Sequence, residues 1–501
     1  MNRSQHIEAS TAMPGLDSGV RAYDAVKALA FIGDLSMGQP TDHSVRTAWL
    51  AFQLAQVLAF DANGCDTVRE ASLLRWSGCT ANASGFADTF GDDIASREAM
   101  LAQRPNWEAL LASQGGASVA ITPLAQIHCE VSGEVARMLD LSAQTQATLR
   151  HIFEAWDGSG FPERLRAREV PESVFVIALA SDLEVFNRVY GIERALQLIA
   201  HRANTCYPVS FVEIATAHAV QWLHTLDQTN PADVDAVLAT QALQRVTPPE
   251  LIADVIDLKL PWLTGYSREV AATAAQCCAR LTSDPDMTNV VYRAGLIHGI
   301  GRAAVPNTIW NHPGQLSASA WEKVRLVPYW TSRAGKQTGT LKEAAELASH
   351  AYERLDETGY FRSVGGIALP LQARILAAAV ASVALRAPRP WRAALSCSDA
   401  TALLREQAAQ GRFDPDVVDA LLASEGSPPL RTNHPTPKVR LSGREIDVLR
   451  LISRGASNKD AAKELALSPS TVRTHVENLF RKLECSTRAA ATLKASSMGV
   501  L

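Results

Sequence analysis

Residues 441–483 read LSGREIDVLRLISRGASNKDAAKELALSPSTVRTHVENLFRKL, and this stretch decides the fold of the C-terminal end. Ser442 and Glu445 are three residues apart, the spacing at which a hydroxyl and a carboxylate each pair with a free N–H group at a helix start. Residues 457–460 repeat that signal. The Ser-Pro step at 468–469 opens a third helix, because a proline at the first helical position leaves no N–H unpaired. The spacing therefore predicts three short helices in succession.

The third helix of this stretch has two different faces. Its inward stripe is apolar and recurs at helical spacing, at Val472, Val476, Leu479 and Leu483. Its other face carries the polar side chains of Arg473, Thr474, Glu477, Asn478 and Arg481. Two short helices joined by a tight turn, the second with polar residues near its start, suit the major groove of DNA. A small helical bundle without a DNA role is the alternative that spacing alone leaves open.

Charge is distributed unevenly along the 501 residues, although the formal net charge is only −4. From Lys438 to the end, twelve Lys and Arg stand against six Asp and Glu, which makes this tail +6. The rest of the chain is therefore −10. A basic tail on an acidic body can bind phosphate locally while the body repels it.

Residues 441–483 resemble the LuxR-type DNA-binding domain, through REIDVL, the turn at Gly455, SNKDAA and SPSTVRTHVENLFRKL. The resemblance implies a four-helix helix-turn-helix domain at 439–501, whose last helix begins after the cap residue Thr487. It also implies that the helix at 468–483 is the recognition helix.

The same resemblance implies roles for single side chains. It puts Arg473 and Thr474 where the family reads base edges. Four further side chains fall where the family touches phosphate, namely Lys459, Thr471, Arg481 and Lys482. Glu477, beside Asn478 on the polar face, departs from the cation or neutral polar residue that the family often has there. A carboxylate repels phosphate or accepts a hydrogen bond from a cytosine amino group. Glu477 therefore puts the preferred DNA sequence in doubt, but it does not put DNA binding in doubt.

Upstream of this domain the chain is mostly helical in pattern. Residues 425–438, EGSPPLRTNHPTPK, predict an irregular linker because of their four prolines, and residues 1–15 predict a disordered tail. The longest apolar run, 375–385, is too short to span a bilayer, and no secretory signal is evident. The eight cysteines include no CxxC pair, which is typical of reduced thiols in a cytoplasm. We therefore expect an all-α cytoplasmic protein without a membrane contact.

Two stretches of the long helical region are similar to each other. AWDGSGFPERL at 155–165 and RLDETGYFRS at 354–363 are both followed by an apolar helix, at 175–186 and 371–385. This repetition predicts two tandem helical domains, at 16–240 and 241–424.

The second of these domains resembles the HD-GYP branch of the HD-domain phosphohydrolases, through residues 255–275, AGLIHGIGRAAVPNTIWNHPGQL at 294–316 and ERLDETGYFR at 353–362. The first domain resembles the same family more weakly, through 38–55 and 70–79. Members of this family are all-helical metal enzymes, and the HD-GYP members cleave cyclic di-GMP. The resemblance implies tandem HD-like domains ahead of the helix-turn-helix domain.

The family's metal ligands are mostly replaced in this sequence. The His-Asp doublet falls on residues 298–299, a His and a Gly, and in the first domain it falls on the Arg-Trp pair at 75–76. An arginine there puts a fixed cation where a metal ion would bind. His43, Asp182 and His298 match ligand positions and are predicted to be vestigial. The sequence thus predicts no catalytic residue, no metal and no cofactor, and hence a pseudo-phosphohydrolase rather than an enzyme.

The leading functional prediction is a bacterial, cytoplasmic transcription regulator that binds double-stranded DNA as a homodimer. Its degenerate HD body would serve sensing and dimerisation, with an unidentified small-molecule effector. The first alternative is an active metal-dependent phosphohydrolase of the HD-GYP type, fused to a DNA-binding domain. The second is a scaffold whose two halves bind another protein.

Overall fold

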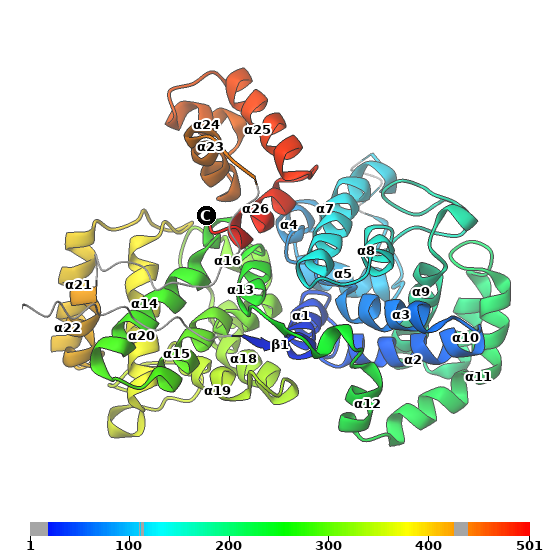
Figure 1. The fold of residues 1–501 in the computed structure, drawn as a ribbon, viewed down its shortest axis with the longest axis horizontal. Coiled ribbons are helices and arrows are strands. Elements are labelled where there is room, and N and C mark those ends of the chain that lie inside the picture. The colour runs from blue at the N-terminus through cyan, green and yellow to red at the C-terminus, as the bar shows by residue number, and fades with distance from the viewer. Residues whose placement is uncertain (1–18, 110, 112–114, 425–438) are drawn as a thin grey trace, which may run out of the picture.

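The computed structural model describes residues 19–109, 111, 115–424 and 439–501. Two helical lobes lie side by side, and a small helical domain sits over the junction between them (Figure 1). The strands of the described residues are β1 (Val20–Arg21) and β2 (Val246–Thr247), which pair antiparallel. The predicted all-α fold is confirmed. The predictions for residues 1–15 and 425–438 lie outside the described residues.

The first lobe is built from α2 (His43–Val57), α3 (Ala62–Leu74), α4 (Ala83–Phe90), α5 (Asp93–Leu101), α7 (Ala117–Met138), α8 (Ala143–Arg150), η1 (Ala167–Glu169), α9 (Glu172–Tyr190), α10 (Ile192–His201), α11 (Val209–Gln228) and α12 (Pro231–Leu238). The second lobe is built from η2 (Ala242–Gln244), α13 (Glu250–Asp257), η3 (Pro261–Leu263), α14 (Tyr266–Leu281), α15 (Pro285–Ile297), η4 (Ile300–Ala304), α16 (Asn307–Trp310), α17 (Ala318–Arg325), α18 (Val327–Gln337), α19 (Lys342–Ala348), η5 (Gly366–Ala368), α20 (Leu371–Arg386), α21 (Cys397–Ala409) and α22 (Pro415–Ser424).

Helix α1 (Ala22–Ser36) joins the two lobes. All 15 of its residues are buried, because it packs on α3 of the first lobe and on α13, η4 and α18 of the second. A helix that is covered on every side belongs to the interior of a large structure rather than to one surface. The lobes consequently share one continuous apolar core.

A buried ion pair also links the lobes. Lys259, just after α13, is fully buried and its Nζ lies 2.8 Å from Oδ2 of Asp93, which is fully buried at the start of α5. The other carboxylate oxygen of Asp93 accepts a hydrogen bond of 2.7 Å from the backbone N–H of Asn307. One carboxylate of the first lobe is thereby bound to two segments of the second.

The two lobes repeat the same local hydrogen bonds. Asp34 accepts hydrogen bonds from both the backbone N–H and the hydroxyl of Ser44, and Asp257 does the same with Ser267. A buried glutamate in each lobe accepts hydrogen bonds from the backbone N–H groups nine and eleven residues later. In the first lobe Glu154 accepts from Glu163 and Leu165. In the second lobe Glu353 accepts from Arg362 and Val364. Each lobe thus contains the same two local hydrogen-bond arrangements.

The small domain consists of α23 (Gly443–Ser453), α24 (Asn458–Glu464), α25 (Pro469–Leu483) and α26 (Arg488–Ser497). The helix starts form as the sequence predicts: Ser442 and Glu445 make a reciprocal capping box, and so do Ser457 and Asp460. Ser468 accepts from the N–H of Thr471. The domain has its own apolar core, to which the inward stripe of α25 contributes.

Candidate functional site

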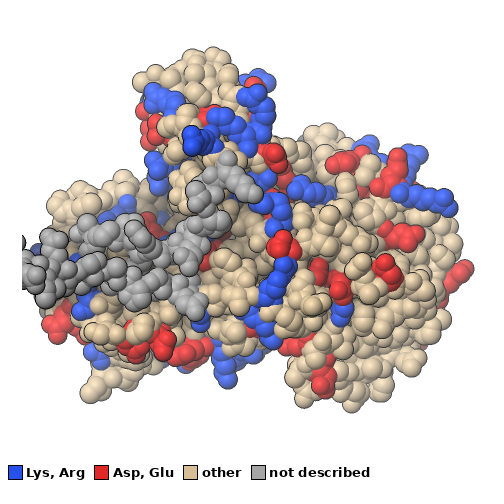
Figure 2. Space-filling view, viewed as in Figure 1, with Lys and Arg blue, Asp and Glu red and all other residues tan. Residues whose placement is uncertain are grey.

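The polar face of α25 is exposed to solvent. Arg473 and Glu477 expose 76% and 62% of their side chains, and Arg473 Nε donates to Glu477 Oε1 at 2.9 Å. Thr474 is exposed between them and donates to the carbonyl of Ser470. Lys and Arg side chains gather on this domain in the view of Figure 2. The residues that the sequence assigns to base reading therefore share one accessible helix face near the start of α25.

The residues assigned to phosphate contact are not equivalent in the structure. Lys459 and Thr471 are exposed at the starts of α24 and α25. Arg481 donates to the side-chain oxygen of Asn478 at 2.8 Å and is also exposed. Lys482 instead donates to Glu445 Oε2 at 2.7 Å, and this carboxylate also caps α23.

Lys482 therefore also stabilises the small domain by binding Glu445, a contact that the sequence did not predict. Burial raises the pKa of Glu445, but the hydrogen bonds from Lys482 and Ser442 outweigh it and hold that pKa below its ordinary value. The contact spans 37 residues of sequence, so the local pattern around Lys482 gives no signal of it.

The second lobe holds its surviving ligand-position histidine in a closed network. His298 is fully buried, and its Nδ1 donates to the carbonyl of Gly295 at 2.6 Å while its Nε2 accepts from Arg302 at 2.7 Å. The guanidinium of Arg302 also lies 3.3 Å from the hydroxyl of Tyr352 and 3.5 Å from Asp257. Burial and then the charge of Arg302 hold the pKa of His298 well below its ordinary value. Both ring nitrogens are occupied, so these residues do not fit a metal ion at His298.

We expect His298 to make stability fall in acid. The folded state requires the neutral ring, whereas the unfolded chain protonates it near pH 6.5. Its contribution is complete above pH 6.5 and decreases as the pH falls below that value. Between pH 7 and pH 5 it should remove roughly 1–2 kcal/mol from the free energy of unfolding.

Urea unfolding at both pH values measures this effect. His298→Gln keeps a donor and an acceptor but cannot titrate, so its pH dependence should be weaker than that of the wild type. The matched control is His312→Gln, at an exposed position. Equal pH slopes for all three proteins would refute the assignment.

The first lobe does not bring its two predicted ligand residues together. The fully buried His43 has its Nδ1 2.6 Å from Oε2 of Glu184, which also accepts from Arg46 and Arg188. Asp182 faces a different partner, Arg202, whose Nε lies 3.1 Å away. Burial, despite the nearby Asp34, lowers the pKa of His43 to about 4. His43 is thus paired with Glu184, and Asp182 with Arg202.

Glu184 was missed at the sequence level. It lies two residues after Asp182 on α9, and only the tertiary pairing with His43 distinguishes the two carboxylates.

Across the described ranges, no group of three or more His, Cys, Asp or Glu side chains is arranged to hold a metal ion. Within the same part of the chain, each helix is too short or too polar to cross a bilayer.

Comparison with known families identifies two regions of the chain. Residues 250–417 match the family described as "HD domain". Residues 439–495 match the family described as "Bacterial regulatory proteins, luxR family".

Similar proteins fall into the same two groups. A "3'3'-cGAMP-specific phosphodiesterase 3" of Vibrio cholerae is 27% identical over 430 residues, covering 77% of this chain and 91% of that protein. A "Cyclic di-GMP phosphodiesterase response regulator" of Xanthomonas campestris is 29% identical over 174 residues, 34% of this chain and 46% of its own length. A "Nitrate/nitrite response regulator protein homolog" of Haemophilus influenzae is 46% identical over 63 residues, 13% of this chain and 30% of its own. The chain thus spans less than half of the last two relatives.

A crystal structure of a cyclic GMP-AMP-specific phosphodiesterase of V. cholerae has the same fold. Its TM-score is 0.58 at 23% identity, and the match covers 82% of this chain and 99% of that one. The match therefore includes both lobes rather than the second alone.

These relatives correct one prediction of the sequence analysis. The chain was expected to be a pseudo-phosphohydrolase and not an enzyme, and that expectation is wrong against relatives that are phosphodiesterases by name. It rested on assigning ligands to single positions. Because a helical ligand set is assembled from several helices, a shift of one residue moves a histidine out of its assigned place, and His151 and His350 each lie one step from such a place.

The family assignment of the chain rests on its fold and on two matched regions. Residues 250–417 match the HD domain, the two lobes share the fold of one phosphodiesterase crystal structure, and residues 439–495 match the luxR family of bacterial regulatory proteins.

Proposed function

We propose that this protein is a transcription regulator that binds double-stranded DNA through α25 and recognises a cyclic dinucleotide through its HD region. The observation that carries the DNA-binding half is the exposed polar face of α25, held on a domain with its own core. The positive charge of that domain supports the same conclusion, because phosphate neutralisation supplies much of the affinity of DNA-binding proteins. The relatives' names support the cyclic dinucleotide.

We further propose that the active form is a cytoplasmic homodimer in which the tandem domains 16–240 and 241–424 provide sensing and dimer contacts. Two copies of α25 would reach two half-sites on one face of the duplex, about one helical turn apart. Helix α26 is packed against α7 and α13 within the same chain, so in this proposal the dimer contact falls to the body.

Full-length protein and random-sequence duplex DNA test the DNA-binding half. The three cations predicted to touch phosphate, Lys459, Arg481 and Lys482, would give six phosphate contacts per dimer. Contacts of that number should lower the affinity by roughly 10³–10⁵ between 50 and 200 mM salt. Fluorescence anisotropy at several salt concentrations measures the slope. Absence of binding at 50 mM salt would contradict the proposal.

The second candidate function is hydrolysis of the cyclic dinucleotide by the HD region, which the named relatives favour. Purified protein incubated with 3'3'-cGAMP or cyclic di-GMP, with and without added manganese or iron, tests it. Linear product that requires the metal would establish the activity. Calorimetric titration with both nucleotides covers recognition without turnover, and a protein that neither binds nor cleaves them contradicts this half of the proposal.

A further inference from the structure

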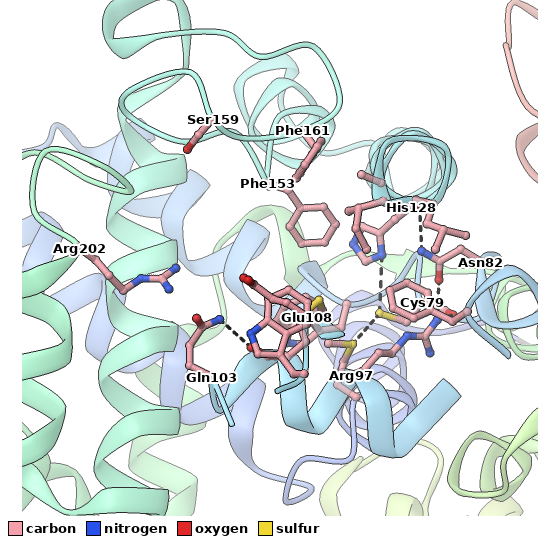
Figure 3. Close-up of a pocket in the computed structure, with 18 residues that line it drawn as sticks. Cys79, Asn82, Arg97, Gln103, Glu108, His128, Phe153, Ser159, Phe161 and Arg202 are labelled. Atoms are coloured by element: carbon pink, nitrogen blue, oxygen red, sulfur yellow. Dashed lines mark hydrogen bonds between the residues drawn. The ribbon is translucent and has the colours of Figure 1, made fainter. Parts of the chain in front are cut away.

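The first lobe contains a cavity of about 410 Å³ that neither ligand-position histidine lines (Figure 3). Five aromatic side chains contribute to its wall, namely Trp76, Phe86, Trp107, Phe153 and Phe161. Its size and lining are typical of sites that enclose a small organic molecule. The polar side chains of Gln103, Glu108 and Arg202 stand around it in Figure 3.

One of the charged groups in the wall, the guanidinium of Arg97, is already bound to the protein. Arg97 is 1% exposed, lies 4.4 Å over the ring of Phe86 and donates to the carbonyl of Ser36, the carbonyl of Cys79 and the side chain of Asn82. These bonds hold the guanidinium in place and use its donors. This part of the wall is thus preformed and offers a ligand apolar and aromatic contact, while the charged side chains of Glu108 and Arg202 line the cavity elsewhere.

His128 closes the side of the cavity nearest to α7. Its Nε2 donates to the carbonyl of Arg75 at 2.7 Å, and its ring lies 4.6 Å from that of Phe153. Burial lowers the pKa of His128 to about 3, so the ring is neutral at cellular pH. A neutral aromatic group at this place again favours an aromatic ligand.

Helix α7 contacts the cavity with one face and the small domain with another. Leu124, Ala125 and His128 line the cavity. On the other face, Glu130 accepts from the backbone N–H of Ser486 at 2.5 Å and from its hydroxyl at 3.0 Å. The cavity and the contact with Ser486 are thus separated by only the width of helix α7.

Three more contacts hold the small domain against this helix and against the core of the lobes. Lys494 of α26 lies 3.4 Å from the buried carboxylate of Glu134 on α7. Thr264 donates to the carbonyl of Ser453 at 2.8 Å. Leu493 of α26 is fully buried in the core of the lobes. A shift of α7 therefore changes the position of the small domain relative to the lobes.

Pro123 lies inside α7, between the cavity-lining residues Ile121 and Leu124. A proline inside a helix removes one backbone hydrogen bond and clashes with the preceding turn. The first turns of α7 are thereby less firmly tied to the rest of the helix, at the point where the helix meets the cavity.

We propose that this cavity binds an aromatic small-molecule effector and that α7 transmits its occupancy to the DNA-binding domain. The binding step stands on the cavity alone, whereas the transmission step rests on the proposed DNA-binding function. An aromatic ligand fills the apolar space, and its polar group lies toward Gln103, Glu108 and Arg202. Occupancy shifts α7 and with it the hydrogen bonds between Glu130 and Ser486.

The test uses the full-length protein and the fluorescent probe anilinonaphthalene sulfonate, which carries aromatic rings and one anionic group. We expect one saturable site per chain. Ala125→Leu extends a buried side chain into the cavity and should weaken probe binding at least tenfold. Met100→Trp fills the cavity from α5 and serves if Ala125→Leu does not fold, which thermal unfolding shows. The matched control Ala217→Leu, at an exposed position of α11, should bind the probe as the wild type does.

A second measurement tests transmission. Saturating probe should change the affinity of the wild-type protein for duplex DNA at least threefold, and it should have no effect on Ala125→Leu. Glu130→Ala should bind the probe normally and lose the response. Probe binding that the cavity variants leave unchanged, or a wild-type DNA affinity indifferent to bound probe, overturns the proposal. A wild-type protein that binds the probe but no DNA refutes the proposed function and leaves the cavity site standing.

Discussion

Lys259→Met should lower the free energy of unfolding by about 3–5 kcal/mol, because it leaves a buried carboxylate without its partner. Lys259 and Asp93 are both fully buried, and their charged atoms are 2.8 Å apart. After the substitution, Asp93 retains the N–H of Asn307 at 2.7 Å and the more distant Arg97 at 3.9 Å. Burial already lowers the pKa of Lys259, although Asp93 opposes that shift. Equilibrium unfolding in urea measures the loss.

Two controls separate the ion pair from the loss of a long side chain. Lys342→Met, at an exposed position of α19, should change stability by no more than about 0.5 kcal/mol. The double variant Asp93→Asn with Lys259→Met removes both charges and should recover part of the loss, since the uncompensated charge is gone. A loss below about 1 kcal/mol for Lys259→Met alone would show that the pair does not join the lobes as described.

The sequence predicts the small domain in detail because its signals are local. A capping box needs two side chains three residues apart, and both boxes of this domain form where the spacing places them. The inward stripe of α25 is buried at Val472, Val476, Leu479 and Leu483, as helical periodicity requires. The apolar periodicity of the lobes likewise suffices for an all-α fold.

The interior of the lobes could not be predicted in this way, because its decisive contacts join distant residues. His43 meets Glu184 across 141 positions, and Lys259 meets Asp93 across 166. Neither pair has a fixed spacing for a pattern to detect. The wrong expectation about enzyme activity likewise rested on single positions, and the named relatives overturn it.

The position of the small domain is a second feature without a local signal. The apolar residues of α26 predict a helix with a buried face. That face could be covered by the core of its own domain or by a contact outside the domain. In the structure α26 divides between them, with Ala491 and Ala495 in the core of the small domain and Leu493 in the core of the lobes. Periodicity gives the buried face of a helix but does not identify what covers it.

Arg473→Ala should weaken binding to a preferred DNA site by about 1–3 kcal/mol and reduce discrimination against variants of that site. Arg473 is 76% exposed and pairs with Glu477 on the same helix, so its side chain can turn toward a base edge once that contact opens. Glu477→Gln removes a negative charge from the same face and should raise the affinity for all duplexes, because phosphate repulsion is lost.

The preferred site is the duplex that the wild-type protein selects from a random pool, and anisotropy gives the affinities of the variants for it. Arg405→Ala, an exposed arginine on α21 of the second lobe, removes the same charge far from α25 and should leave both affinity and discrimination unchanged. If Arg473→Ala weakened all duplexes equally, Arg473 would contact phosphate rather than a base, because phosphate contacts carry no sequence information. If it weakened none, α25 would not be the recognition helix, and the DNA contact would have to be sought elsewhere on the small domain.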